Sequence, residues 1–237
     1  MMEKNSIGWQ KQPDKLNIQG TIEKAIERIT GEQVDLMASG RTDRGVHALG
    51  QVANFKTNSN IPIEKFAIAI NSNLKKSILI KSAEEVDERF HSRLTCKKKT
   101  YRYVINNSKY GTAIYRNLET HIPIKLNIEE MQKAIKFFEG EHDFKAFKSS
   151  GTSSKSSVRT IYKAEVKQMP NDKIWIELTG NGFLYNMVRI IAGTLVEVGL
   201  GKIKANEIND IMESKRRENA GKTLPPQGLY LVNVEYE

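Results

Sequence analysis

Apolar residues recur along this chain mainly at helical spacing, with shorter alternating runs between the helical segments. Over residues 21–29 they return every third or fourth position, which is typical of an amphipathic helix. Pro62 opens a second predicted helix at the first helical position, where its missing N–H costs nothing. Asn127, with Glu130 placed for a capping box, starts a third helix that Gly140 ends. Further helices are predicted over 184–198 and 205–212.

Shorter segments alternate apolar and polar residues, the pattern of half-exposed strands. The best of them, 100–105, places Tyr101, Tyr103 and Ile105 on one face. The other predicted strands cover 51–55, 78–80, 160–167, 174–178 and 229–236. Such alternation favours antiparallel sheets over a buried parallel one. We therefore expect an α+β fold in two lobes, with the boundary between Phe90 and Tyr101.

Charge and composition narrow the function. The 37 Lys+Arg and 28 Asp+Glu give 37 − 28 = +9, which indicates a polyanionic partner such as nucleic acid, although many proteins are mildly basic. The single cysteine, Cys96, excludes a disulfide scaffold and suits a reducing cytoplasm. No apolar stretch is long enough for a membrane span or a signal peptide, so we expect no membrane role and a cytoplasmic protein.

The segment 40–47, Gly-Arg-Thr-Asp-Arg-Gly-Val-His, places Asp43 between Arg41 and Arg44 in a glycine-bracketed loop. Neighbouring guanidinium groups favour the ionised form of a carboxyl group. An ionised carboxylate can act as a nucleophile or a general base, and the glycines would let a bulky substrate approach. The alternative is an ordinary surface turn in which Asp43 bonds to its own backbone.

Two further segments carry candidate chemistry. Lys97–Lys99 precede a strand bearing Tyr101 and Tyr103, a combination that suits phosphate contact and base stacking. The tyrosines could equally be core residues and the lysines simply solvated.

Arg189 is the other candidate, because it lies in the almost wholly apolar segment 184–198, which predicts a buried helix. A buried arginine needs an anionic partner. That partner is Asp43, a phosphate or Glu197, and the pattern does not choose among them.

The sequence offers no metal-ligand spacing, since Cys96 is alone and the histidines are scattered. It also lacks a Walker loop, a dinucleotide fingerprint and a Gly-x-Ser-x-Gly elbow. We therefore expect no zinc site. The histidines are His47, His91, His121 and His142.

The run SGRTDRGVHALGQVANF, residues 39–55, closely resembles the catalytic motif of the tRNA pseudouridine synthase A (TruA) family. Other segments resemble that family in the same order along the chain, so the likeness covers essentially all of it. They are GWQKQP (8–13), RFHSR (89–93), KKTYRY (98–103), GEHDFKAF (140–147), NMVRIIAGTLVEVG (186–199) and GLYLVNVEY (228–236).

The resemblance implies a pseudouridine synthase fold with largely antiparallel sheets, flanked by helices, in an N-terminal lobe (1–93) and a C-terminal lobe (94–237). It implies an active cleft between the lobes and isomerisation of uridine to pseudouridine in the tRNA anticodon stem-loop, at sites 38, 39 and 40. Members use no cofactor and no metal, and they are homodimers.

The resemblance also implies roles for single residues. Asp43 would be the nucleophile, Tyr101 would stack on the target base, Arg41 would hold the flipped-out nucleotide, and Arg189 would pair with the aspartate. Whether Asp43 attacks C1′ of the ribose or C6 of the base stays open.

The chain departs from the family in two places. It begins MMEKNSIGWQ, without the first strand and most of the Y-D-G-T turn of other members, so we expect an unpaired edge in the N-terminal sheet. The residue after Asp43 is Arg44, where the family often has a small one. Two alternatives remain open: a catalytically inactive tRNA-binding protein or chaperone, and a metal-dependent nuclease using Asp43 with His47.

Overall fold

The computed structural model describes residues 8–11, 17–151 and 156–237. It divides the chain into two compact units, residues 1–96 with Tyr236–Glu237, and residues 97–235. The chain thus passes from one unit to the other after Cys96. The expectation about the start of the chain falls on residues 1–7, and part of the serine-rich loop falls on residues 152–155; both lie outside the described residues.

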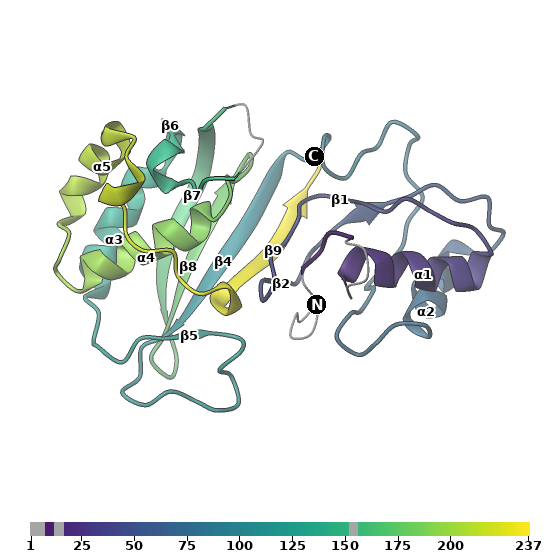
Figure 1. Cartoon of the computed structure of the whole chain (residues 1–237), viewed down its shortest axis with the longest axis horizontal. Coiled ribbons are helices and arrows are strands. Elements are labelled where there is room, and N and C mark those ends of the chain that lie inside the picture. The colour runs from purple at the N-terminus through teal and green to yellow at the C-terminus, as the bar shows by residue number, and fades with distance from the viewer. Residues whose placement is uncertain (1–7, 12–16, 152–155) are drawn as a thin grey trace. The chain divides into compact units, whose positions relative to one another are not determined.

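The first unit packs two helices beside short strands (Figure 1). Trp9, Ile22, Ile26 and Phe66 lie in its core and are each no more than 6% exposed. The elements are α1 (Ile18–Thr30), β1 (Met37–Ala38), β2 (His47–Ala48), β3 (Ala53–Asn54) and α2 (Ile63–Asn71).

Helix α1 confirms the periodicity of 21–29 and begins three residues earlier than that range. Asn17 caps it by accepting a hydrogen bond from the Gly20 N–H at 2.8 Å. Its buried face carries Glu23, whose carboxylate accepts from the Leu36 N–H at 3.2 Å and pairs with Lys11 at 2.9 Å. Because the buried charge has these partners, the helix can turn an acidic residue toward the core.

Two local expectations in this unit are wrong. Pro62 is the N-cap of α2, and its carbonyl accepts from the Lys65 N–H at 2.9 Å, so the helix starts one residue later. Residues 78–80 form no strand. The Asn71 side chain instead bonds to both backbone groups of Ile80, each at 2.8 Å, so a side-chain amide takes the place of a neighbouring strand.

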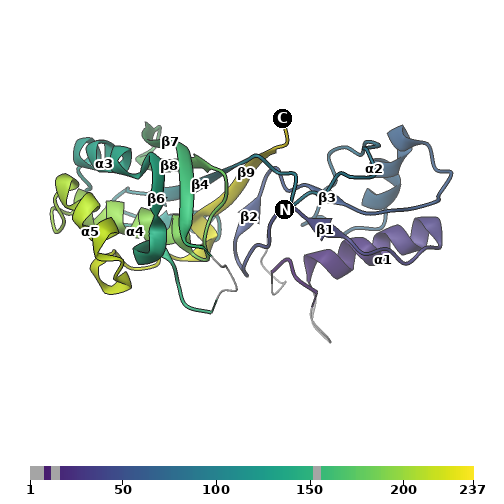
Figure 2. The same cartoon turned by 90° about the horizontal axis from the view of Figure 1, so that it is seen from above.

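The second unit is a sheet with helices packed on it (Figures 1 and 2). Its strands lie in the order β9, β4, β8, β7, β6, each antiparallel to its neighbour where the register is given, and β5 runs parallel to β4. The strands are β4 (Lys98–Asn106), β5 (Thr120–His121), β6 (Gly140–Asp143), β7 (Val158–Met169), β8 (Lys173–Gly180) and β9 (Leu229–Glu235). The α-helices are α3 (Ile128–Ile135), α4 (Met187–Gly199) and α5 (Ile208–Ser214), and short 3-10 turns cover 136–138, 144–147, 205–207, 217–219 and 226–228.

Alternation along β4 divides its side chains between two environments. Tyr103 and Ile105, on the face toward the helices, are completely buried. On the other face, Arg102 pairs with Glu177 at 2.7 Å and lies 3.7 Å from the centre of the Trp175 ring. The predicted alternation of 100–105 is therefore confirmed, and the charged face is held by cross-strand pairs.

The start of α3 agrees with the prediction, but its end does not. Asn127 accepts from the Glu130 N–H at 3.2 Å and starts α3, as expected. The Asn127 N–H donates to the Gly199 carbonyl, so the expected capping box with Glu130 does not form. The prediction that Gly140 ends the helix is wrong, because α3 ends at Ile135, a 3-10 turn follows, and Gly140 begins β6.

Helix α4 is buried over almost its whole surface, which confirms the apolar prediction for 184–198. It begins at Met187, since Asn186 has a φ of 61° and interrupts the helical path.

The fold class is therefore α+β, as expected, with antiparallel pairing predominating in the part of the chain that the structure describes. Within those same residues, no helix is long and apolar enough to cross a membrane.

Candidate active-site residues

The Asp43 loop is closed at its base by backbone and side-chain hydrogen bonds. Strands β1 and β3 pair antiparallel, and the Ser39 N–H donates to the Val52 carbonyl at 2.8 Å. The Gln51 amide spans the two ends, since Oε1 accepts from Ser39 Oγ at 2.6 Å and Nε2 donates to the Gly40 carbonyl at 2.7 Å. The loop therefore leaves a fixed base, which limits how far Asp43 can move.

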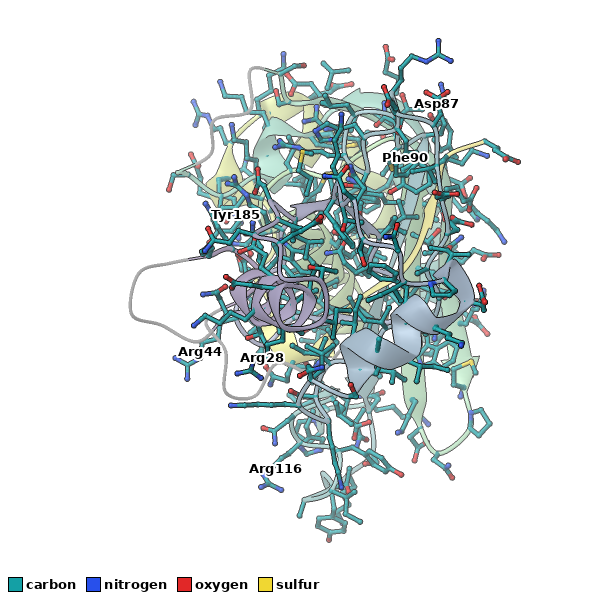
Figure 3. The ribbon with its side chains drawn as sticks, turned by 90° about the vertical axis from the view of Figure 1, so that its right-hand side faces the viewer. Arg28, Arg44, Asp87, Phe90, Arg116 and Tyr185 are labelled. Atoms are coloured by element: carbon teal, nitrogen blue, oxygen red, sulfur yellow. The ribbon has the colours of Figure 1, made fainter. Side chains whose placement is uncertain are left out.

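Asp43 begins a tight turn at the tip of this loop. The Val46 N–H donates to the Asp43 carbonyl at 3.1 Å, and Gly45, with a φ of 83°, occupies the position where a type II turn needs a positive φ. The Asp43 side chain is exposed, and so is Arg44, which points outward (Figure 3). Asp43 thus lies in a turn with its side chain accessible. A surface turn and a catalytic loop share these features.

The segment Gly8–Trp9 binds this turn from the side. Gly8 forms a bridge with Asp43, and the Trp9 N–H donates to the Thr42 carbonyl at 3.0 Å. Gly8 has a φ of 110°, and a Cβ there would lie 2.7 Å from the Thr42 oxygen, so only glycine fits. Trp9 is 4% exposed in the core, which anchors the segment.

Ser92 holds the base of the loop from below, a role the sequence did not reveal. It is completely buried. Its N–H donates to Asn54 Oδ1 at 2.9 Å, its Oγ donates to the Met37 carbonyl at 2.6 Å, and its carbonyl accepts from the Tyr236 hydroxyl at 2.8 Å. Ser92 thus ties β1, β3 and the C-terminal residues together. The signal available was its place in the RFHSR segment, although that pattern does not say what the serine contacts.

The remaining candidates of the first unit differ in exposure. Arg41 is exposed beside Asp43 in sequence, whereas His47 is 3% exposed. Among the described residues there is no group of three or more His, Cys, Asp or Glu side chains that could hold a metal ion.

Tyr101 belongs to the second unit and lies near the start of β4. Its ring is half-buried and meets Phe183 edge-on, with the ring centres 5.0 Å apart and the planes at 76°. Next to it, β9 carries one extra residue between the partners of Thr100 and Tyr101. A bulge of this kind changes the direction in which nearby side chains point. Tyr101 is thus less enclosed than a core tyrosine.

Tyr103, two positions further on, is the core tyrosine of this strand. It is completely buried, and its hydroxyl bonds with Thr120 Oγ at 2.5 Å and donates to the Pro225 carbonyl at 2.7 Å. Burial raises the pKa of its phenol well above the usual range. Tyr103 is therefore a core residue, as one of the two interpretations of these tyrosines expected. Base stacking stays a prediction for Tyr101.

The three lysines around the start of β4 differ in their surroundings. Lys97 is exposed. Lys98 lies 3.9 Å from Glu235 and 5.7 Å from the centre of the Tyr162 ring. Lys99 shares the face of Tyr101 because it lies two residues before it. Phosphate contact by this segment stays a prediction.

Arg189 is half-buried on α4, with its guanidinium group oriented by two neutral oxygens. Nε donates to the Leu224 carbonyl at 2.7 Å, and Nη1 donates to Asn186 Oδ1 at 2.6 Å. The loop that supplies Leu224 crosses α4 so closely that a Cβ on Gly193 would lie 1.9 Å from the Lys222 carbonyl oxygen. The approach of this loop is thus what brings the Leu224 carbonyl within reach.

The position of Arg189 connects it to the tyrosine strand. The Leu224 and Pro225 carbonyls, which are consecutive, accept from Arg189 and from Tyr103. The charge of Arg189 also acts to lower the pKa of Tyr103, against the larger effect of burial. Glu197 pairs with Lys202 at 2.9 Å. The glutamate therefore does not form the structural pair with Arg189 that was one of the alternatives.

The second unit thus brings Arg189 to the helix-covered face of β4, which also carries Tyr101. Asp43 and Arg41 belong to the first unit. Each unit holds its candidate side chains on an element fixed by hydrogen bonds, an arrangement typical of an enzyme that positions charged groups on rigid supports.

A model of the tRNA pseudouridine synthase family matches residues 4–94 and 134–237. The chain therefore belongs to the tRNA pseudouridine synthase family, a family of isomerases.

Its relatives agree over nearly the whole chain. It is 55% identical to a tRNA pseudouridine synthase A of Caldicellulosiruptor saccharolyticus over 232 residues, which is 98% of this chain and 95% of that protein. It is 54% identical to one of Acetivibrio thermocellus, with the same coverage. A Brevibacillus brevis protein of the same name is 46% identical, over 97% of this chain and 93% of its own length. The resemblance read from the motifs is thereby confirmed.

Proposed function

We propose that this protein isomerises uridine to pseudouridine in the anticodon stem-loop of tRNA, at the sites numbered 38, 39 and 40, with Asp43 as the nucleophile. The observation that carries the proposal is the Asp43 loop, whose exposed carboxylate sits on a turn fixed by Gly8, Gly45 and Gln51. A turn braced from several sides fits a residue that must be positioned precisely.

The reaction breaks the C1′–N1 bond of uridine and joins C1′ to C5. The C5 proton is lost and N1 gains one, so no atom of the nucleoside except exchangeable hydrogen needs to enter or leave. A carboxylate that bonds to the substrate at C1′ or at C6 allows the freed uracil to turn before it is rejoined. This chemistry needs no redox cofactor or metal, and we propose that the enzyme uses neither.

The other candidate residues fit the steps around the nucleophile. A uridine must leave its stack to be reached, which costs a few kcal/mol. Stacking on the half-buried Tyr101 ring would return about 1–3 kcal/mol. Arg41, exposed beside Asp43, would hold the extruded nucleotide. Arg189, already oriented by Leu224 and Asn186, would pair with the Asp43 carboxylate and keep it ionised.

We further propose that the sequence lobes 1–93 and 94–237 divide these tasks, that the protein acts as a homodimer and that it works in the cytoplasm. The single cysteine and the tRNA substrate support that location. The net charge of +9 supports binding to tRNA through its phosphates. Binding should then weaken steeply with salt, because each neutralised phosphate releases counterions.

The test compares wild type with Asp43→Ala and Asp43→Asn on unmodified tRNA transcripts bearing uridines at the three sites. Pseudouridine is read by carbodiimide treatment and primer-extension stops. Asp35→Ala is the matched control, since it removes an exposed carboxylate from the same unit. Both Asp43 variants should be inactive and the control fully active.

Each alternative has its own outcome in this assay. Full activity in either Asp43 variant would refute the nucleophile. Salt-sensitive tRNA binding by a wild type that forms no pseudouridine on any transcript would favour the inactive tRNA-binding protein or chaperone. Pseudouridine formation that persists in EDTA would argue against a metal-dependent use of Asp43 with His47.

A further inference from the structure

Asn186 has a left-handed backbone conformation, which is unusual for the residue just before a helix. It immediately precedes α4, where a helix cap is ordinarily extended, yet its φ is 61° and its ψ is 6°. A left-handed conformation costs most residues with a Cβ about 1–2 kcal/mol and costs asparagine less. The Asn186 side chain does not cap the helix. Contacts of that side chain elsewhere can offset the cost that remains.

The contacts of the Asn186 amide provide that offset. Oδ1 accepts from Arg189 Nη1 at 2.6 Å, and Nδ2 donates to Ser149 Oγ at 3.0 Å. Ser149 is itself held, because its N–H donates to the Tyr185 carbonyl at 3.1 Å. From its left-handed position just before the helix, the Asn186 side chain reaches both Ser149 and the guanidinium group of Arg189 one turn along α4.

Arg189 therefore has its guanidinium group fixed at two points. The Leu224 carbonyl accepts from Nε, and Asn186 accepts from Nη1. Two hydrogen bonds to different nitrogens of one planar group set the direction of its plane more closely than either bond does by itself. Hydrogen bonds from a charged donor are also about twice as strong as neutral ones.

We propose that Asn186 is a positioning residue, which sets the plane of the Arg189 guanidinium group for its pairing with the catalytic carboxylate. The strain of the left-handed backbone is then the cost of placing an acceptor at Nη1. This inference rests on the proposed function, because it gives Asn186 a role only through Arg189.

Two variants separate the side chain from the backbone. Asn186→Gly keeps the left-handed conformation at no steric cost and removes the amide. Removing the backbone cost and losing the two side-chain hydrogen bonds act in opposite directions, so the thermal midpoint should stay near that of wild type. The kcat should fall about 10- to 100-fold, with KM for tRNA changed less than about threefold. Asn186→Asp keeps an oxygen for Arg189 in a residue type that also tolerates this conformation, and kcat should stay within about threefold of wild type.

A double-mutant cycle with Arg189→Met tests whether Asn186 acts through the arginine. Arg189→Met should impair turnover more than tRNA binding. Adding Asn186→Gly to it should change kcat by less than about twofold, because the group to be positioned is already absent. Single-turnover measurements with enzyme in excess keep slow variants measurable.

The outcomes distinguish this inference from the function beneath it. A fully active Asn186→Gly beside an impaired Arg189→Met would overturn the inference alone. So would an Asn186→Asp as slow as the glycine variant, or an equal further loss from Asn186→Gly in the methionine background. A fully active Arg189→Met would overturn the role proposed for Arg189, and the inference with it.

Discussion

Replacing Gly8 by alanine tests whether the Gly8–Trp9 segment positions the Asp43 turn. The added Cβ would lie 2.7 Å from the Thr42 carbonyl oxygen and 3.3 Å from the Arg44 nitrogen. Both are backbone atoms of the turn, so no side chain can rotate away to make room. Either Gly8 or the turn must move.

The cost has two parts. Alanine at a φ of 110° loses about 1–2 kcal/mol to backbone strain. Forcing a methyl group into packed surroundings costs about 1–3 kcal/mol more. The sum, about 2–5 kcal/mol, is below the stability of most domains, so the variant should still fold. A turn that relieves the clash by moving about 1 Å could lower kcat by about 100-fold.

Gly31→Ala is the matched control, since Gly31 has a φ of 76° but nothing lies within 4 Å of an added Cβ. It should lose only the strain energy and keep its activity. Urea unfolding should show Gly8→Ala less stable than Gly31→Ala by about 1–3 kcal/mol. Its kcat on tRNA should fall at least about tenfold. A Gly8→Ala protein with wild-type kcat and the stability of the control would refute the reasoning.

Three further changes test other parts of the structure. Tyr101→Phe should change tRNA affinity in filter binding by less than about threefold, whereas Tyr101→Ala should lose about 1–3 kcal/mol; equal effects would exclude stacking. Ser92→Ala removes the hydroxyl donor to the Met37 carbonyl and should lower the free energy of unfolding by about 1–3 kcal/mol in urea; an unchanged value would show that the Ser92 hydroxyl does not hold the base of the loop. At Glu177, burial acts to raise the carboxyl pKa, but hydrogen bonds from Lys167 and Arg102 outweigh it and hold the pKa below the ordinary 4.5. Its contribution to stability is therefore full above pH 4.5 and lost as the pH falls through the lower folded value, so the stability gap between wild type and Glu177→Gln should shrink between pH 7 and pH 3. A gap of constant size would contradict this assignment.

Much of the fold could be predicted from local patterns. The periodicity of α1, the Asn127 cap and the alternation of 100–105 each depend on neighbouring residues in the sequence, and all three agree with the structure. The predicted strand at 78–80 failed because Asn71, nine positions away, supplies the hydrogen bonds that a neighbouring strand would have supplied. Hydropathy does not register a side chain used in this way.

The candidate site shows the same division. The motif around Asp43 and the lone cation of an apolar helix were enough to select Asp43 and Arg189. The residues that support them, Ser92 and Asn186, were not predictable. Both act through hydrogen bonds to residues distant in the sequence, and Asn186 also has a left-handed backbone. A serine in a short polar segment and an asparagine before a helix have nothing in their local pattern to distinguish them from many others.

The bond between Ser92 and Tyr236 joins residues 144 positions apart. On the ribosome, where chains grow at about 5–20 residues per second, roughly 7–30 seconds separate the synthesis of the serine from that of the tyrosine. The hydrogen bond that helps to hold the base of the Asp43 loop is therefore completed only after the whole second unit has been translated, and the nascent first unit spends that interval without it.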